Sequence, residues 1–266
     1  MGRRLGRAGG AGRLLKVLQQ VVIMVAAAAV YFGVRHLTRG ETPAAARNGD
    51  RLIVLERSLG IDWEVPVQRA AFEVPLLPTV ANWVYIYGHW PFIISALIWL
   101  VIWHRPVFLR ARNAMLISGA VGIVVFATFP VLPPRLAGIG LVDTVTQRSN
   151  SYRVLQPTGF TDEYAAMPSL HAGWTLIVSL ALIAATRNVL LRVFAVAVTL
   201  SMDLAVVVTA NHYILDVVAG LALTGALWFV VGPKPGRPGR DPAAWVRRAV
   251  RGRRRRGSGR GGAAVG

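Results

Sequence analysis

Apolar residues are concentrated in six separate runs, each close to the length that a membrane-spanning helix needs. A helix rises about 1.5 Å per residue, so about 20 residues cross the roughly 30 Å of hydrocarbon in a bilayer. The runs cover residues 14–34, 80–103, 114–132, 169–185, 189–210 and 213–231. The pattern therefore predicts an all-α polytopic membrane protein whose fold is a bundle of six transmembrane helices.

A polar stretch with its own helical pattern separates the first two apolar runs. Leu52, Leu55 and Leu59 recur at helical spacing, and three prolines between residues 66 and 78 interrupt any longer helix. We therefore expect an interfacial helix and a loop there. The predicted organisation has four parts: a basic N-terminus (1–13), a first transmembrane helix with the interfacial segment (14–79), a five-helix core (80–231) and a basic, disordered tail (232–266).

Basic residues are distributed unequally between the two sides that six spans would create. Segments on the side of the termini carry 21 of them and segments on the opposite side carry 9. Cytoplasmic loops are enriched in Lys and Arg, so we expect both termini in the cytoplasm and the protein in the plasma membrane. The first apolar run lacks a well-placed cleavage site, which favours a retained signal anchor over an export signal.

Composition narrows the classes of function. The net charge is +18, but eleven of the thirty basic residues follow Val231. Such a block anchors a chain on anionic lipid, at about 1 kcal/mol per basic residue, and no module that reads nucleic acid accompanies it. The chain has no cysteine and no H-E-x-x-H motif, so we expect neither a metal nor a cofactor. The oligomeric state is left open.

Two histidines flank the predicted hairpin formed by the fourth and fifth spans. His171 ends MPSLH and His212 lies in NHYILD, 41 residues later, which accommodates two crossings and a turn at Arg187–Arg192. Both imidazoles would then lie at the outer interface. Asp216 follows His212 by one helical turn, where its carboxylate can accept from one ring nitrogen and leave the other as a nucleophile or base.

Two further features place positive charge at the same interface. Arg135 follows a proline pair at the outer end of the third span, although ordinary snorkelling explains an isolated arginine there equally well. Pro168 and Ser169 suit the first turn of a helix, whose backbone N–H groups would form a cradle for an anion. A well-made helix start explains these two residues without any ligand.

These segments resemble the type 2 phosphatidic acid phosphatase superfamily, and more closely its inositol phosphorylceramide synthase-like branch. The likeness is carried by FPVLPPRL (129–136), YAAMPSLHAGW (164–174) and VVVTANHYILDVVAG (206–220), with NWVYIYGHWP (82–91) as a feature of the branch. It covers about residues 82–231. The resemblance implies that the five-helix core is a metal-independent enzyme, a phosphatase or inositol-type phosphotransferase acting on a lipid phosphate or phosphorylated headgroup at the outer leaflet.

The resemblance also implies a role for each candidate residue. His212 would attack phosphorus to give a phosphohistidine, Asp216 would orient its ring, and His171 would protonate the leaving alkoxide. Arg135 would hold the non-bridging oxygens together with the backbone at Ser169, Leu170 and His171. Five residues are candidates for a headgroup pocket, the first three of which also fit a polar seam between helices: Asn82, Tyr85, His89, Asn211 and Tyr213.

Two phosphate clamps of the superfamily pattern are absent. Val206 stands where the third motif usually has an arginine, and the first motif lacks its usual lysine. Arg148 and Arg153, besides Arg135, are candidates to replace them.

An alternative hypothesis from another class is a proton-coupled transporter that uses Asp203, His212 and Asp216 as a relay. The chain shows no inverted repeat of the kind that such transporters contain. Asp203 itself lies near the middle of a predicted span, where we expect it to be protonated or paired with Thr199, and we assign it no catalytic role.

Overall fold

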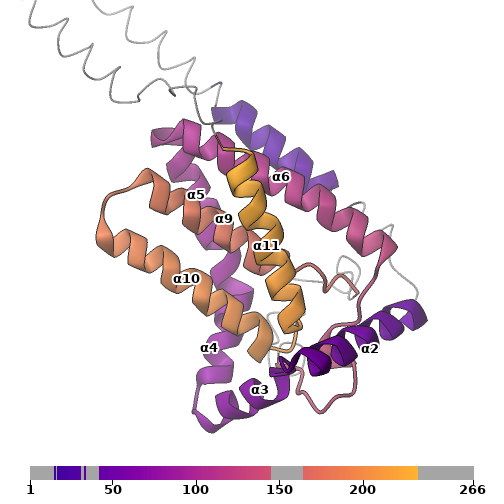
Figure 1. Cartoon of the computed structure of the whole chain (residues 1–266). Helices are drawn as coiled ribbons and strands as arrows, with labels where there is room; N and C mark the ends of the chain where they lie inside the picture. Colours follow the sequence, from indigo (N-terminus) through magenta and orange to yellow (C-terminus); the bar gives the residue numbers. More distant parts are fainter. Residues whose placement is uncertain (1–14, 16, 31–32, 34–41, 145–163, 233–266) are drawn as a thin grey trace, which may run out of the picture. The chain divides into compact units, whose positions relative to one another are not determined.

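The computed structural model describes residues 15, 17–30, 33, 42–144 and 164–232, and within these the chain is helical (Figure 1). The helix Val17–Val30 is followed by α2 (Thr42–Leu59), α3 (Glu64–Glu73), α4 (Leu77–Trp83), α5 (His89–Trp103), α6 (Arg105–Thr128), α9 (Leu170–Ala185), α10 (Val189–Val208) and α11 (Ile214–Val230). The all-α class is thereby confirmed. The predicted basic N-terminus and basic tail lie outside the described residues, apart from Gly232.

Three helical stretches are long and apolar enough to cross a membrane: Leu77–Trp103, Arg105–Thr128 and Val189–Val208. Three further apolar helices are shorter, namely Val17–Val30, Leu170–Ala185 and Ile214–Val230. All six overlap the predicted apolar runs, although α6 begins at Arg105 rather than at residue 114, and the number of membrane crossings stays a prediction. The first of the long stretches is continuous from α4 to α5 because a π-helical turn, Val84–Gly88, joins them.

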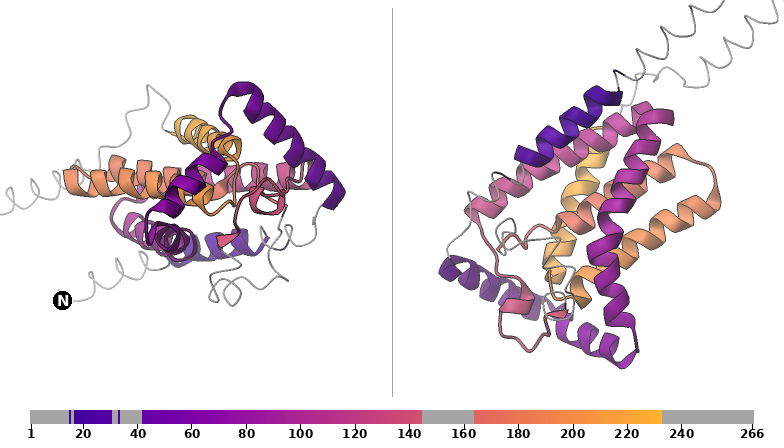
Figure 2. Two further views of the ribbon diagram at one scale, coloured as in Figure 1. Left: turned by 90° about the horizontal axis from the view of Figure 1, so that it is seen from below. Right: turned by 180° about the vertical axis from the view of Figure 1, so that it is seen from behind.

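Helix α9 is the central element of the bundle and packs against α5, α6, α10 and α11 (Figure 1, Figure 2). It approaches α11 closely, and glycines make this approach possible. A Cβ on Gly173 would lie 2.6 Å from Thr224 Cγ2, and a Cβ on Gly220 would lie 3.0 Å from the carbonyl carbon of Ser169. Small residues at a crossing let helix backbones approach closely, so these two glycines bring the start of α9 against the start of α11.

The third span ends earlier than the sequence predicts. Helix α6 stops at Thr128, and the residues that follow are extended because they bond to two other segments. The amide of Val131 donates to the carbonyl of Tyr164 at 2.7 Å, and that of Leu132 donates to the carbonyl of Ala45 at 3.0 Å. Tertiary hydrogen bonds therefore replace the last helical turn expected before the proline pair.

The interfacial segment contains two helices, α2 and α3, where one helix and a loop are predicted. Leu52 is buried, whereas Leu55 and Leu59 remain 46% and 57% exposed. Val54 and Trp63 are also exposed, so this region presents an apolar outer face of the kind that lies in a lipid interface. The opposite face of α2 carries Glu56 into the protein.

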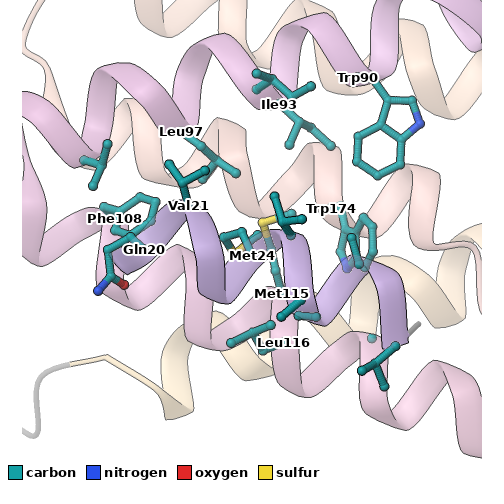
Figure 3. A pocket seen from close by; sticks show the side chains of 18 of the residues that line it. Gln20, Val21, Met24, Trp90, Ile93, Leu97, Phe108, Met115, Leu116 and Trp174 are labelled. Carbon is teal, nitrogen blue, oxygen red and sulfur yellow. The ribbon is translucent and has the colours of Figure 1, made fainter. Parts of the chain in front are cut away.

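An apolar groove of about 640 Å³ lies between the helix Val17–Val30, α5 and α6. Figure 3 shows Phe108 and Gln20 toward one end of it and Trp90 and Trp174 toward the other. The rings of these two tryptophans meet edge to face with centroids 6.2 Å apart. The residues after Trp174 along α9 belong to the apolar core, whereas the turn before it carries His171.

Candidate active site

His212 lies in a tight connection between α10 and α11. Ala210 adopts a left-handed conformation with φ of 55° and turns the chain, and the amides of Asn211 and His212 both donate to the carbonyl of Val206. The imidazole Nδ1 lies 2.8 Å from the carbonyl oxygen of Ala166. A carbonyl can only accept, so Nδ1 carries the proton and the neutral ring keeps its lone pair on Nε2.

Asp216 lies close to Nδ1 of His212 and also binds the backbone of the next residue. Its Oδ2 accepts the amide of Tyr213 at 2.9 Å and lies 3.6 Å from Nδ1 of His212, which is an ion-pair distance rather than a hydrogen bond. The carboxylate is fully buried. The predicted pairing of His212 and Asp216 is therefore electrostatic, and Ala166, which sequence reasoning missed, makes the orienting hydrogen bond.

His171 is supported mainly by aromatic rings. Its ring centroid lies 4.7 Å from that of Tyr85 and 4.5 Å from that of His89. His89 in turn lies with Nδ1 3.2 Å from the hydroxyl of Thr175, which donates to the carbonyl of His171. The π-helical turn at Val84–Gly88 adds a residue to the spacing, so that both aromatic residues reach His171.

The two imidazoles predicted to converge do lie close together. Their ring centroids are 6.1 Å apart, at an interplanar angle of 54°. The amide of Ser169 donates to the carbonyl of Asp216 at 2.9 Å, which ties the start of α9 to the start of α11. The glycine crossing of the two helices thus sets the separation of the histidines.

Arg135 is held beside this pair. Its Nη1 donates to Oδ1 of Asn211 at 2.7 Å, and its Nε lies 3.5 Å from Oδ2 of Asp143. The side chain is only 9% exposed, so simple snorkelling into water does not describe it. The side-chain amide of Asn211 also donates to the hydroxyl of Thr209. Asn211, the residue before His212, is thereby fixed and holds the guanidinium of Arg135 in place.

Fewer backbone amides are available to an anion at the start of α9 than the sequence predicts. Ser169 is the N-cap, and its hydroxyl accepts the amide of Ala172, as predicted for a well-made helix start. Its own amide is already donated to the carbonyl of Asp216, so Ser169 cannot also hold a phosphate oxygen through that group. The expectation therefore narrows to the amides of Leu170 and His171, which point along the N-terminal end of the helix.

The five candidates for a headgroup pocket divide into three groups. Tyr85 and His89 contact the ring of His171, and Asn211 binds Arg135. The side chain of Asn82 exchanges two hydrogen bonds with Thr144, which holds together two segments of the fold. The Tyr213 ring is fully buried in an apolar cluster with Val131 and Ala166, so the contacts of Asn82 and Tyr213 are structural.

The positions where the chain departs from the resembled pattern are only partly described. Val206 is fully buried among apolar residues and leaves no room for a charged clamp. Arg148 and Arg153, the candidates to replace it, lie outside the described residues. Thr199 contacts Ser179 and the carbonyl of Ala195 rather than Asp203, so the predicted pairing of Asp203 with Thr199 is not observed.

Two buried acids that sequence reasoning passed over lie next to the site. Glu56 accepts the amide of Leu215 at 2.8 Å, and Glu64 accepts the amide of Ile214 at 2.9 Å. A signal for Glu56 was present, because an acidic residue stands on the same helix face as Leu52 and Ile53. No comparable pattern marks Glu64.

Comparison with known proteins gives one match. The model of a family described as the PAP2 superfamily matches residues 50–230. No curated protein and no solved structure matches the chain. The matched range includes every candidate residue of the site and both buried acids, and it begins within α2.

Proposed function

The chain belongs to the PAP2 superfamily, and we propose that it is a membrane enzyme that moves the phosphoryl group of a lipid phosphate through a phosphohistidine on His212. Membership supports phosphoryl transfer on lipid phosphates in general. The observation that carries the finer proposal is the hydrogen bond from Nδ1 of His212 to Ala166, because it leaves the lone pair of the ring on Nε2, in a ring whose centroid lies 6.1 Å from that of His171.

The proposed reaction has two steps. Nε2 of His212 forms a bond to phosphorus while the bond from phosphorus to the ester oxygen breaks, and His171 gives its proton to the departing alkoxide. Water or an alcohol then attacks the phosphohistidine, gives its proton to His171 and releases His212. Attacking and leaving atoms lie roughly in line in such transfers, which is consistent with two imidazoles on opposite sides of one phosphorus.

Positive groups balance the charge of the transferring phosphoryl group. The guanidinium of Arg135 is one such group, because it is bound to Asn211, the residue before His212. The N-terminal end of α9 adds the amides of Leu170 and His171 and the positive end of the helix dipole. Asp216 balances the imidazolium character that His212 gains when it becomes attached to phosphorus.

A long apolar chain on the substrate fits the surroundings of the site. The ring of Trp90 stacks edge to face on His89 at 5.2 Å, and His89 stacks on His171. Trp90 also lines the apolar groove of about 640 Å³, so the groove adjoins the site through one row of rings. In our proposal this end of the bundle faces the outer leaflet, and the asymmetry of basic residues supports that orientation.

Substitution of the two histidines tests the proposal. We expect His212→Ala to lower turnover on the order of 10³-fold or more, and to abolish the acid-labile phosphoprotein that forms with a radiolabelled substrate. The assay uses the full chain in detergent with phosphatidic acid, an isoprenyl pyrophosphate and a phosphatidylinositol phosphate. His104→Ala is the matched control, because that histidine stacks on Trp99 at the opposite end of α5.

His171→Ala should slow formation of the phosphoprotein without preventing it, since the nucleophile remains. Wild-type turnover by His212→Ala would remove the proposed mechanism. Product analysis with and without added inositol separates the two outcomes of the second step, because transfer gives a phosphorylated polyol and hydrolysis gives free phosphate alone.

A further inference from the structure

The first turn of α11, which follows His212 directly, is bound by carboxyl groups from three parts of the chain. The amide of Tyr213 donates to Asp216 at 2.9 Å, that of Ile214 to Glu64 at 2.9 Å, and that of Leu215 to Glu56 at 2.8 Å. The first amides of a helix have no partner within the helix. Here three in succession are satisfied by acids, two of which come from about 150 residues earlier in the sequence.

Glu56 and Glu64 are built into the protein rather than placed on its surface. They are 1% and 3% exposed. Glu56 lies on the inner face of α2 and Glu64 at the start of α3, and these helices approach the ends of α11 and α10 that carry the site (Figure 1). Their carboxyl oxygens accept adjacent amides of one turn and border the same cavity, so the two groups lie near each other. Two buried carboxyl groups this close repel each other when both are ionised, and a proton on one of them removes that repulsion.

We propose that Glu56 and Glu64 are positioning residues for the nucleophile of the proposed function, and that they hold the first turn of α11 as a pair that shares one proton. They touch neither substrate nor imidazole. Their effect on His212 passes through the backbone of the residues that follow it, which determines how the ring meets Ala166 and Asp216. The expected effect on turnover rests on the proposed function, whereas the positioning of the turn does not.

The pair suits this place for two physical reasons. Negative charge near a helix N-terminus is stabilised by the helix dipole, and charged acceptors make stronger hydrogen bonds to backbone amides than neutral ones do. Keeping one shared proton limits the pair to a single negative charge beside Asp216. A cavity of about 270 Å³ borders both side chains and gives that proton a route to exchange.

The surroundings of Glu56 make the shared proton sensitive to alkali. The ionisable groups around it are Glu64, Asp216 and Tyr213, with Arg57 and Asp62 on the same cavity, and Asp50 lies near Tyr213. Arg57 is exposed and pairs with Asp62 at 3.9 Å, so it does not neutralise the pair. Burial, and then the neighbouring Glu64, raise the pKa of Glu56 to about 8. Above this pH Glu56 itself becomes negatively charged beside two other buried acids, which weakens its hold on the turn.

Three variants of the full chain in detergent test the proposal, with whichever lipid phosphate the wild-type protein turns over fastest. Glu56→Ala removes the acceptor for Leu215, and we expect turnover at pH 7 to fall between about 10- and 100-fold. Glu56→Gln keeps an oxygen acceptor and is uncharged, like the protonated acid. It should retain turnover within about threefold at pH 7 and lack the decline that we expect of the wild type above pH 8.

Glu73→Gln is the matched control, since Glu73 is an exposed acid on the same helix as Glu64. A second readout does not depend on activity: hydrogen exchange of the amides at residues 214–215 should accelerate in Glu56→Ala and stay at the wild-type rate in Glu56→Gln and Glu73→Gln.

Unchanged exchange at residues 214–215 in Glu56→Ala would overturn the positioning role. An alkaline decline in Glu56→Gln equal to that of the wild type would overturn the shared proton. If Glu56→Ala does not fold, the pH profile of Glu56→Gln still tests whether the pair shares a proton. Failure of the proposed function shows separately, as wild-type turnover in His212→Ala with the exchange results unaffected.

Discussion

The two imidazoles of the site are held by different kinds of contact. His212 is fixed by hydrogen bonds and charge, from Ala166 and Asp216 on its ring side and from acids on the turn that follows it. His171 is held between the rings of Tyr85 and His89. A hydrogen bond selects one tautomer and one direction, whereas ring stacking fixes the plane and tolerates a change of protonation.

That difference matches the roles that we propose for His212 as nucleophile and His171 as general acid. A nucleophile needs its lone pair on one particular nitrogen, and the carbonyl of Ala166 supplies that constraint. A general acid must lose and regain a proton in each cycle, and the ring contacts of His171 with Tyr85 and His89 tolerate that change.

Gly220→Ala should break both supports at once. A Cβ there would collide with the carbonyl group of Ser169, so α9 and α11 must separate and carry His171 away from His212. We expect turnover to fall by more than about 10²-fold, together with a loss of thermal stability of about 1–3 kcal/mol. Gly225→Ala is the control, because a Cβ there meets Leu176 at an ordinary 3.9 Å. Equal behaviour of the two variants would contradict the crossing as the element that sets the site.

Asp216→Asn removes the negative charge beside His212 and keeps an oxygen acceptor in the same place. Where a carboxylate alone fixes the tautomer of a catalytic histidine, this change costs about 10⁴-fold. Here Ala166 fixes the tautomer and an asparagine oxygen can still accept the amide of Tyr213, so we expect a smaller loss of about 10²-fold in kcat. Steady-state kinetics and the melting temperature measure it. A loss near 10⁴-fold would mean that Asp216, not Ala166, sets the tautomer.

His89→Ala tests the stacking support on His171. An aromatic pair contributes about 0.5–1.5 kcal/mol beyond its buried area, which corresponds to a decrease in turnover of about tenfold or less. His89→Phe keeps a ring against His171 but loses the contact with Thr175, and should recover most of the activity. If the phenylalanine variant is as slow as the alanine variant, the hydrogen bond with Thr175 is the support that matters.

The smallest effect concerns stability and pH. Burial raises the pKa of Glu56 to about 8, above its ordinary value of 4.5. A carboxyl group whose pKa is raised on folding stabilises the protein fully below its unfolded pKa, and the contribution is lost as the pH rises through the folded value. The wild type should therefore lose a few degrees of melting temperature between pH 6 and pH 9 that Glu56→Gln retains. Parallel curves for the two proteins would contradict the burial of an acid there.

Local patterns carried much of the fold. Apolar run lengths located all six apolar helices, and Pro168 with Ser169 marked the start of α9. The end of α6 was predicted too late, because hydrogen bonds of Val131 and Leu132 to distant segments replace its last turn. The same limit applied to the polar candidates: helical spacing placed Asn82, Tyr85 and His89 on one face, and a π-helical turn divided them between Thr144 and His171.

Periodicity and distance along the chain were enough to predict the helical class and the return of two histidines and an aspartate to one end of the bundle. The groups that hold the histidines depend on the tertiary structure. Ala166 acts through its backbone, and Glu56 and Glu64 act on amides about 150 residues away. Such partners are chosen by how closely α9 and α11 approach at Gly173 and Gly220, and no local pattern encodes that distance.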